Sequence, residues 1–359
     1  MIPVTKPFLP PIEEYQSLIA DVWQRQWLTN NGPLVNELEL QLKTRLDIPH
    51  LLYVTNGTIA LQLAIKALNL RGEIITTPFS YVATCSSIIW EGCTPIFVDI
   101  NSKDFNINPE LIEASITPKT TAILATHVFG NACDIEAIGK IADKHNLKVI
   151  YDAAHCFGTT YKSQSIFKFG DVSTTSFHAT KLFHTVEGGA VFTKDSDLLK
   201  KLAFLRNFGH HGPKEFAEVG INGKNSELHA AMGLLNLNYL DEILQRRKQQ
   251  SLHYIEKLRH SVIQFPTLNK DTRYNYAYFP VVFQSEAQTL KVIQDLEANR
   301  ISPRRYFYPS LNTIDLFGRS SCPESELIAS KVLCLPLYHT LTLTDVDYIC
   351  RIILRTINN

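Results

Sequence analysis

Short apolar runs alternate with helical patterns between about residues 50 and 195. The runs are rich in β-branched residues and read LLYVT, EIITT, TPIFVDI, TAILATHVF, KVIYDA, VSTTSF and GAVFT, starting at residues 51, 73, 94, 121, 148, 172 and 189. Alternation of this kind is typical of repeated βαβ units. We therefore expect an α/β fold with a mostly parallel seven-stranded sheet and helices on both of its faces.

Three helices in this region have recognisable starts. IALQLAIKAL follows Thr58, and DIEAIGKIADKH begins with Asp134, a natural N-cap ahead of apolar residues at helical spacing. NNGPLVNELELQL offers Asn30 or Asn31 as cap, Pro33 in the first turn and leucines at positions 34, 38 and 42. The residues before this helix predict an extended arm.

The C-terminal part of the chain has a different pattern. A long helical stretch begins at Ser226 and continues to about residue 258, and we interpret it as the spacer between two domains. Beyond it, a strand pattern in YAYFPVVF is followed by a helical pattern in EAQTLKVIQDLEA. We expect a large α/β domain over residues 1–245, including the N-terminal arm, and a smaller α+β domain over residues 246–359.

Composition narrows the possible partners. The 359 residues carry 35 basic and 35 acidic side chains, so no overall field favours nucleic acid or an anionic membrane. The seven cysteines never form a CxxC pair, which is typical of reduced cytoplasmic thiols and argues against a metal site. Prolines interrupt the N-terminus, and no apolar run approaches the roughly 18 residues of a membrane span, so we expect neither a signal peptide nor a membrane segment.

Two residues at predicted strand ends could carry chemistry. The run VIYDAAHCFG delivers Asp152 to the carboxyl edge of the sheet, where α/β proteins bind ligands, although Asp152 could instead cap a helix. Lys181 follows a strand in SFHATKLFHTVEGGA, ahead of the Gly188-Gly189 pair, which would permit close backbone approach to a bound group. A carboxylate can hold a pyridinium nitrogen protonated, and a lysine can act as nucleophile and base.

Two further segments complete a candidate cofactor site. In YVTNGTIALQLAI a strand and an Asn56-Gly57 turn lead into a helix start, where free N–H groups and the Thr58 hydroxyl could bind a phosphate. In TTPFSYVATCSSI, Tyr81 could stack on a pyridine ring, whereas Phe79 is expected in the core. Walker A and GxGxxG patterns are absent, which argues against NTP hydrolysis and dinucleotide binding.

In this order and spacing the motifs resemble the DegT/StrS family of pyridoxal phosphate (PLP) dependent nucleotide-sugar aminotransferases, which have fold type I. The resemblance spans nearly the whole chain, from WLTNNGPLVNELE through VIYDAAHCFG, TSFHATK and GINGKNSELHAAMGL to RRYFYP and VLCLPLY. It implies Lys181 as the Schiff-base lysine, Asp152 on the pyridine nitrogen, and Tyr81 as the stacking aromatic. His155, where many members have Gln, would lie near the ring hydroxyl. His178 is expected to be a packed or hydrogen-bonded structural residue.

The same resemblance implies an active site shared by two subunits. Gly57, Thr58 and Ser176 of one subunit, with Asn222 of its neighbour, would hold the cofactor phosphate, so the expected assembly is a homodimer. The nucleotide sugar would bind at the subunit interface. Candidates for sugar contacts are Thr29, Asn30, Asn31, His184 and Glu187, for which solvated, structural or interface roles are the alternative.

The expected reaction is a ping-pong transamination. L-glutamate would give its amino group to the cofactor, and a dTDP-4-keto-6-deoxyhexose would then receive it, giving the 4-amino-4,6-dideoxy sugar, with the gluco product expected, for O-antigen or another surface polysaccharide. A 3-keto sugar or a UDP-linked 4-keto sugar is the alternative substrate. A non-catalytic regulator that binds a sugar nucleotide is the alternative of another class, and Lys181 and Asp152 argue against it.

Overall fold

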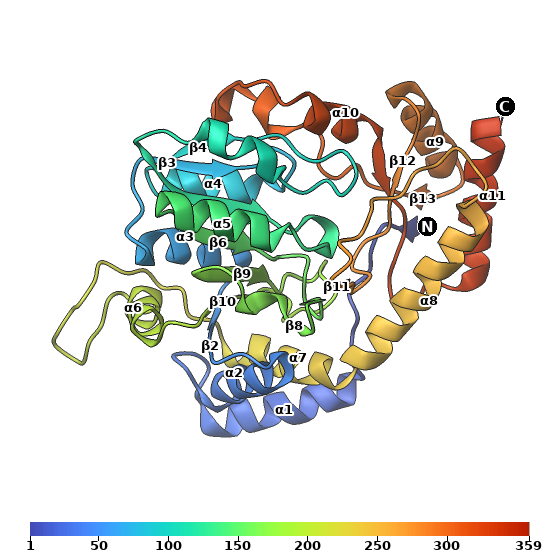
Figure 1. Cartoon of the computed structure of the whole chain (residues 1–359). Helices are drawn as coiled ribbons and strands as arrows, with labels where there is room; N and C mark the ends of the chain where they lie inside the picture. The colour runs from blue at the N-terminus through green and yellow to red at the C-terminus, as the bar shows by residue number, and fades with distance from the viewer. Residues whose placement is uncertain (359) are drawn as a thin grey trace.

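The computed structural model describes residues 1–358, and its centre is a seven-stranded sheet (Figure 1). The strand order is β2-β10-β9-β6-β5-β3-β4, and only β10 runs antiparallel to its neighbours. The bounds are β2 His50–Val54, β3 Glu73–Thr76, β4 Thr94–Phe97, β5 Thr120–Thr126, β6 Lys148–Asp152, β9 Val172–Ser176 and β10 Gly189–Thr193. All seven predicted runs form strands, and the predicted mostly parallel sheet is confirmed.

Helices cover both faces of this sheet. One face packs on α2 (Pro33–Leu46), α5 (Ile135–His145) and α7 (Glu227–Asn238), in the apolar cluster that contains Leu51 and Tyr53 of β2. The other face packs on α3 (Gly57–Ala67), α4 (Val82–Trp90) and α6 (Ser196–Arg206), in the cluster that contains Leu52 and Val54. Alternate β2 residues therefore point to opposite faces, both of them buried, which explains the continuous apolar run in the sequence.

Local capping explains two helix starts, and one predicted cap is wrong. The side chains of Asn56 and Asp134 accept hydrogen bonds from the N–H groups of Ile59 and Ala137, at 2.8 and 3.0 Å. Helix α2 has Gly32 at its N-cap position rather than Asn30 or Asn31. The buried carboxylate of Glu227 accepts the N–H groups of Leu34 and Val35 instead, at 3.0 and 2.9 Å. The carboxylate of Glu227, which is distant in the sequence, therefore caps α2 in place of a local asparagine.

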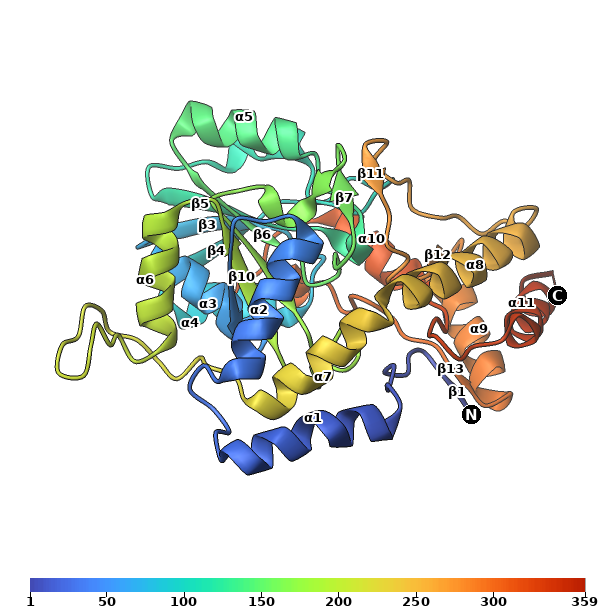
Figure 2. The same cartoon turned by 90° about the horizontal axis from the view of Figure 1, so that it is seen from below.

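The N-terminal segment is only partly the extended arm that was expected. Residues Ile2–Pro3 form β1, which pairs with β13 (Ile301–Ser302), but Ile12–Arg25 form helix α1. Helix α1 packs along α7, and the Tyr15 hydroxyl donates to the carbonyl of Leu228 at 3.1 Å (Figure 2). The N-terminus therefore crosses from the central sheet to the C-terminal part of the chain.

The C-terminal part has its own apolar cluster. The predicted long helix begins after Ser226, whose side chain caps it, but it is divided at Tyr239 into α7 and α8 (Leu240–Leu258). The cluster joins α8, α9, α11 and the two-stranded β12-β14 sheet, from Tyr254 to Ile353. The remaining bounds are β7 Thr160–Tyr161, β8 Gln164–Ser165, β11 Thr272–Arg273, β12 Pro280–Val282, α9 Glu286–Ala298, α10 Pro323–Lys331, β14 Val332–Cys334 and α11 Leu343–Asn358. The division at residue 245 stays a prediction.

One segment stands away from the body of the molecule. Residues 207–223, which follow α6, form a long loop that projects beyond the rest of the chain in both cartoon views (Figures 1 and 2). The loop exposes Phe208, Phe216, Val219 and Ile221 to solvent. Apolar side chains on a projecting loop are typical of a contact surface.

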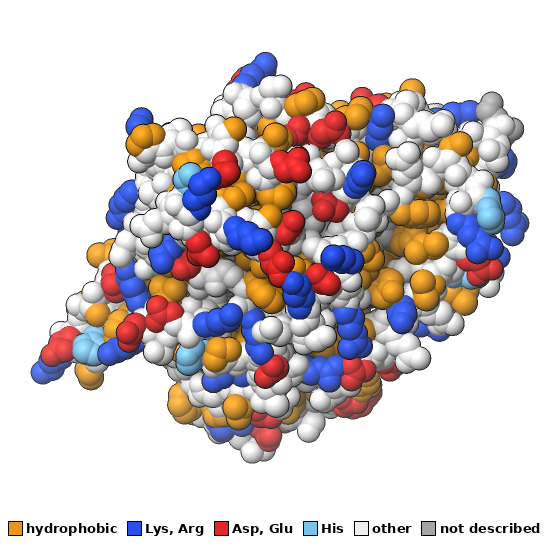
Figure 3. All heavy atoms as spheres, viewed as in Figure 1, with side chains coloured by type: hydrophobic (Ala, Val, Ile, Leu, Met, Phe, Trp, Pro, Cys, Tyr) orange, Lys and Arg blue, Asp and Glu red, His pale blue; other side chains and the backbone are white. Residues whose placement is uncertain are grey.

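The visible surface mixes acidic and basic side chains without a large region of one sign (Figure 3). This distribution agrees with the formal net charge of zero. Along residues 1–358, no helix combines the length and the apolar character that crossing a membrane would require.

Candidate functional site

A cavity of about 690 Å³ opens at the carboxyl edge of the central sheet. Its walls come from the segments after β2 and β3, the ends of β5, β6 and β9, and the chain between β9 and β10, with further side chains from the C-terminal part. Of the predicted site residues, those that line it are Gly57, Thr58, Tyr81, Asp152, His155, Ser176, Lys181 and Glu187. The parallel strands bring these distant segments together, because their carboxyl ends meet at one edge.

Asp152 is held in one orientation by two donors. The Thr84 hydroxyl donates to Oδ2 at 2.7 Å, and the Ala154 N–H donates to Oδ1 at 3.1 Å. Burial raises the pKa of the Asp152 carboxyl, while these hydrogen bonds and the nearby Lys181 amine oppose that rise. A cationic group beside the free lone pairs of Asp152 would favour the ionised form further. The carboxylate does not cap a helix.

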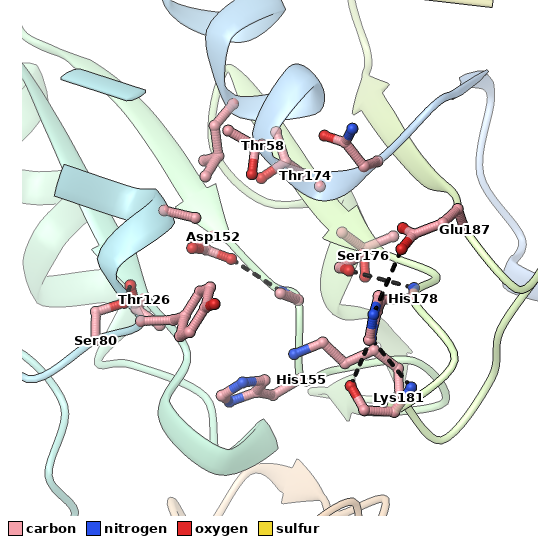
Figure 4. Close-up of a pocket in the computed structure, with 18 of the residues that line it drawn as sticks. Thr58, Ser80, Thr126, Asp152, His155, Thr174, Ser176, His178, Lys181 and Glu187 are labelled. Atoms are coloured by element: carbon pink, nitrogen blue, oxygen red, sulfur yellow. Dashed lines mark hydrogen bonds and ion pairs between the residues drawn. The ribbon is translucent and has the colours of Figure 1, made fainter. Parts of the chain in front are cut away.

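Lys181 extends into the cavity between Asp152 and His155 (Figure 4). Its Nζ donates to the hydroxyl oxygen of Tyr278 at 3.3 Å. Burial lowers the pKa of Lys181 to about 8, although the Asp152 charge raises it in part. A lysine with this lowered pKa has a much larger neutral fraction at neutral pH than an ordinary lysine, although most of the amine is still protonated, so it is a better nucleophile and base.

His155 is a buried, neutral imidazole on the cavity wall. Burial lowers the pKa of His155 well below its usual value, and the Lys181 charge acts in the same direction. Its Nδ1 accepts the N–H of Phe129 at 3.2 Å, which leaves the proton on Nε2. His155 can therefore donate one hydrogen bond to an anionic or hydroxyl oxygen in the cavity.

The start of α3 forms a cradle for an anion. The N–H groups of Gly57 and Thr58 have no partner inside the helix, and the helix dipole adds positive potential there. A Cβ on Gly57 would lie 2.8 Å from the Cβ of Ser176, and one on Gly189 would lie 2.8 Å from the Gly57 nitrogen. The glycine at position 189 thus permits approach of protein backbone, rather than of a bound group as expected.

Polar groups line the rest of the cavity. His178 accepts the N–H of Thr180 on Nδ1 at 3.2 Å, and its Nε2 lies 3.5 Å from Oε1 of Glu187. His178 is hydrogen-bonded as predicted, but it lines the cavity and is half-exposed rather than packed. Tyr81 is also half-exposed and lines the cavity, whereas Phe79 lies in the core as predicted.

Several predicted contact residues lie outside this cavity. His184 is buried, and its Nε2 bonds to the carbonyl oxygen of Phe8 at 2.7 Å, so it fixes the N-terminal segment. The side chain of Asn222 accepts a hydrogen bond from Lys224 at 3.0 Å, on the projecting loop. Thr29, Asn30 and Asn31 lie in the turn between α1 and α2, away from the cavity lining.

Sequence reasoning missed the side chains that the C-terminal part contributes. Tyr278, Arg304, Tyr306 and Phe307 line the cavity although they are 97 or more positions from Lys181. In the sequence, the segment RRYFYP is distinguished only by the family resemblance. Its position against the cavity depends on packing between the two parts of the chain, and no local pattern marks it.

The cavity fits the expected cofactor, PLP. A phosphate matches the N–H groups of the α3 start and the Ser176 hydroxyl, and a protonated pyridine nitrogen matches the buried carboxylate of Asp152. A ring oxygen matches the remaining donor of His155, and an aldehyde matches the amine of Lys181. Each polar group of the cofactor therefore has a partner of the right chemistry at this edge of the sheet.

Comparison with known proteins agrees with a PLP-binding aminotransferase. The model of the DegT/DnrJ/EryC1/StrS aminotransferase family matches residues 11–354. A dTDP-4-amino-4,6-dideoxy-D-glucose transaminase of Shigella dysenteriae is 41% identical over 96% of both chains. The crystal structure of DesI in the presence of its TDP-sugar product has a TM-score of 0.93 at 31% identity, covering 99% of this chain and 93% of that one. The PLP form of Spr1654 from Streptococcus pneumoniae has a TM-score of 0.92 at 25% identity, covering 99% and 98%.

Proposed function

Since this chain belongs to the DegT/DnrJ/EryC1/StrS aminotransferase family, we propose that it moves the amino group of L-glutamate to dTDP-4-keto-6-deoxyglucose, giving dTDP-4-amino-4,6-dideoxyglucose. The observation that carries the substrate is the full-length match to the Shigella transaminase. We further propose that this sugar serves the synthesis of O-antigen or another surface polysaccharide.

The enzyme is a PLP-dependent transaminase. Bound PLP supplies an electron sink for breaking a C–H bond next to nitrogen, and it carries the amino group between the two half-reactions. In our proposal the start of α3 and Ser176 bind the phosphate, and Asp152 keeps the ring nitrogen protonated. His155 would donate a hydrogen bond from Nε2 to the ring oxygen, and Tyr81 would stack on the ring.

Lys181 does the chemical work of the protein in both half-reactions. Its Nζ would hold the cofactor, and as a free amine it would move a proton to and from the substrate carbon. Burial, which lowers the pKa of Lys181 to about 8, increases the fraction of neutral amine that can accept that proton. The Tyr278 hydroxyl, 3.3 Å from Nζ, holds the freed amine near the reacting atoms.

The proposed assembly is a homodimer with each active site at the subunit interface. Asn222 lies outside the cavity of its own chain, on a loop that projects from the body and exposes four large apolar side chains. A second subunit would cover these side chains and bring Asn222 to the partner's cofactor phosphate. The turn at Thr29, Asn30 and Asn31 is proposed to reach the sugar at the same interface, together with Glu187.

We place the enzyme in the cytoplasm. The seven cysteines are all unpaired and buried. Unpaired thiols are typical of proteins that work in a reducing compartment.

Absorption spectroscopy of the holoenzyme tests the function. We expect a visible band that L-glutamate removes and dTDP-4-keto-6-deoxyglucose restores, with the product identified as the 4-amino sugar by mass spectrometry and NMR. Restoration by a 3-keto sugar or a UDP-linked sugar alone would correct the substrate. A band that no amino donor removes would contradict transamination itself.

Lys181→Ala provides the matched control. This variant keeps the phosphate cradle and Asp152 but has no amine for the proton transfer, so multiple turnover should be lost while the fold and PLP binding persist. Normal turnover by Lys181→Ala would remove Lys181 from the mechanism.

A further inference from the structure

Arg304 brings a positive charge without an ionic partner to the C-terminal wall of the cavity. Its guanidinium carbon lies 4.7 Å above the ring centre of Tyr306, and its side chain lines the cavity. In the described chain, no carboxylate lies within ion-pair distance of Arg304, whereas Arg305 next to it is paired with Glu286 at 2.7 Å. The two adjacent arginines therefore have different surroundings. Arg305 forms an ion pair within the protein, whereas Arg304 faces the cavity.

The Arg304 charge lies close to the reacting amine. The Tyr278 hydroxyl is 3.3 Å from Nζ of Lys181, the Tyr306 ring meets the Tyr278 ring edge-on at 5.4 Å, and Arg304 covers Tyr306. Two tyrosine side chains in contact with each other therefore link the guanidinium to Lys181. In agreement with this proximity, the Arg304 charge is one of the factors that lower the pKa of Lys181.

The other charges of the cavity already have partners in the proposed reaction. Asp152 is used by the cofactor ring nitrogen, and Glu187 lies 3.5 Å from His178. Lys181 is the reacting group, and the start of α3 serves the cofactor phosphate. Arg304 is then the one permanently charged cation of the cavity lining with no assigned anion.

We propose that Arg304 binds the α-carboxylate of the amino donor. This inference rests on the proposed transamination and adds to it the residue that recognises the donor. In an α-amino acid the carboxylate is two bonds from the nitrogen that must reach the cofactor, so its binding site has to lie near Lys181. A guanidinium offers the paired donors that match a carboxylate.

The diphosphate of the nucleotide sugar is the competing anion. In a hexose that reacts at C4, the nearest phosphorus is separated from the reacting carbon by several bonds across the ring. A cavity residue linked to Lys181 through two tyrosine side chains is therefore better placed for the donor carboxylate than for the diphosphate. The two assignments predict losses in opposite half-reactions, which makes them separable.

The test measures each half-reaction of the holoenzyme by absorption. For Arg304→Met we expect the L-glutamate concentration for half-maximal loss of the visible band to rise by about 10- to 100-fold. Arg304→Lys should recover part of this loss, because it keeps the charge without the paired donors. The concentration of dTDP-4-keto-6-deoxyglucose that half-restores the band should stay within about 2-fold of wild type.

Arg305→Met is the matched control, because it removes the same charge one residue away, from a side chain that does not line the cavity. It should leave the L-glutamate dependence unchanged. Weakening of the keto sugar half-reaction in Arg304→Met would assign the residue to the diphosphate and overturn the proposal, and so would unchanged L-glutamate dependence.

Both half-reactions are first measured with the wild-type protein. If wild type fails to transaminate, the proposed function is contradicted independently of any effect of Arg304. If a different amino acid removes the band, the same comparison with that donor still tests Arg304, because every α-amino acid has this carboxylate.

Discussion

The Thr84 hydroxyl donates a 2.7 Å hydrogen bond to Oδ2 of Asp152, joining the first turns of α4 to the end of β6. Ser80 and Thr126 continue this chain of hydroxyls, with Ser80 2.7 Å from Thr84 and 3.0 Å from Thr126. The hydroxyl of Thr84 opposes the effect of burial on the Asp152 pKa. Thr84 is thus a positioning residue for the carboxylate that the cofactor needs in its ionised form.

Replacing Thr84 with Val should reduce turnover by about 10-fold, because one hydrogen bond to a charged group is lost. The Asp152 pKa would rise further, so the acid limb of the pH–rate profile should move to higher pH. Thr84→Ser, which keeps the hydroxyl, is the control and should stay near wild type. An unchanged acid limb in Thr84→Val would contradict this role for the hydrogen bond. Asp152→Asn removes the charge itself and should cause a much larger loss.

The reaction of the apoenzyme with PLP should depend on pH through Lys181. Because the pKa of Lys181 is lowered to about 8, the neutral amine increases as the pH rises from 6 to 8, by roughly 50-fold. The second-order rate constant, followed by stopped-flow absorption, should rise with the same midpoint and level off above it. In Arg304→Met the midpoint should move upward, since a neighbouring positive charge is gone. A midpoint above pH 9.5 in wild type would contradict the effect of burial.

Gly57→Ala should weaken PLP binding. The new Cβ would lie 2.8 Å from the Cβ of Ser176, so either the α3 start or the end of β9 must move, and both belong to the proposed phosphate cradle. We expect the Kd for PLP, from fluorescence titration of the apoenzyme, to increase by about 10-fold or more. Gly139→Ala is the control, because Gly139 lies within α5 with open space around it. It should leave PLP binding unchanged and stabilise the helix by about 0.5–1 kcal/mol. Equal PLP affinity in both variants would argue against the cradle.

His127 should make the holoenzyme less stable in mild acid. Burial lowers the pKa of His127 to about 3, whereas the unfolded chain titrates near 6.5. The unfolded state therefore binds more protons between these values, and the stability that is present above pH 6.5 is lost as the pH falls.

The free energy of unfolding, from urea titrations between pH 7.5 and 5, should fall less steeply in His127→Asn than in wild type, by up to about 1.4 kcal/mol per pH unit. Asparagine can still accept the Cys133 N–H that His127 accepts at 3.0 Å. His211→Asn, at a half-exposed histidine, is the control and should keep the wild-type slope. Identical slopes for His127→Asn and wild type would contradict the prediction.

The sequence by itself determined the central sheet and the main catalytic candidates. Strand patterns depend on neighbouring residues, so the seven runs from Leu51 to Thr193 could be recognised locally, as could the cap at Asp134. Asp152 and Lys181 could be singled out for the same reason. Each follows a recognisable strand, and parallel strands deliver their carboxyl ends to one edge whatever the rest of the fold does.

Only the tertiary structure decided the features that depend on residues far apart in the chain. The α2 start is capped by Glu227, 193 positions from Leu34, so the choice between Asn30 and Asn31 could not be correct. His184 is near Lys181 in sequence, yet its backbone turns it toward Phe8 and away from the cavity. Tyr278 and Arg304 reach the cavity because the C-terminal part packs over the sheet edge. Such contacts arise from burial of surfaces on separate elements, and no local pattern encodes which surfaces will meet.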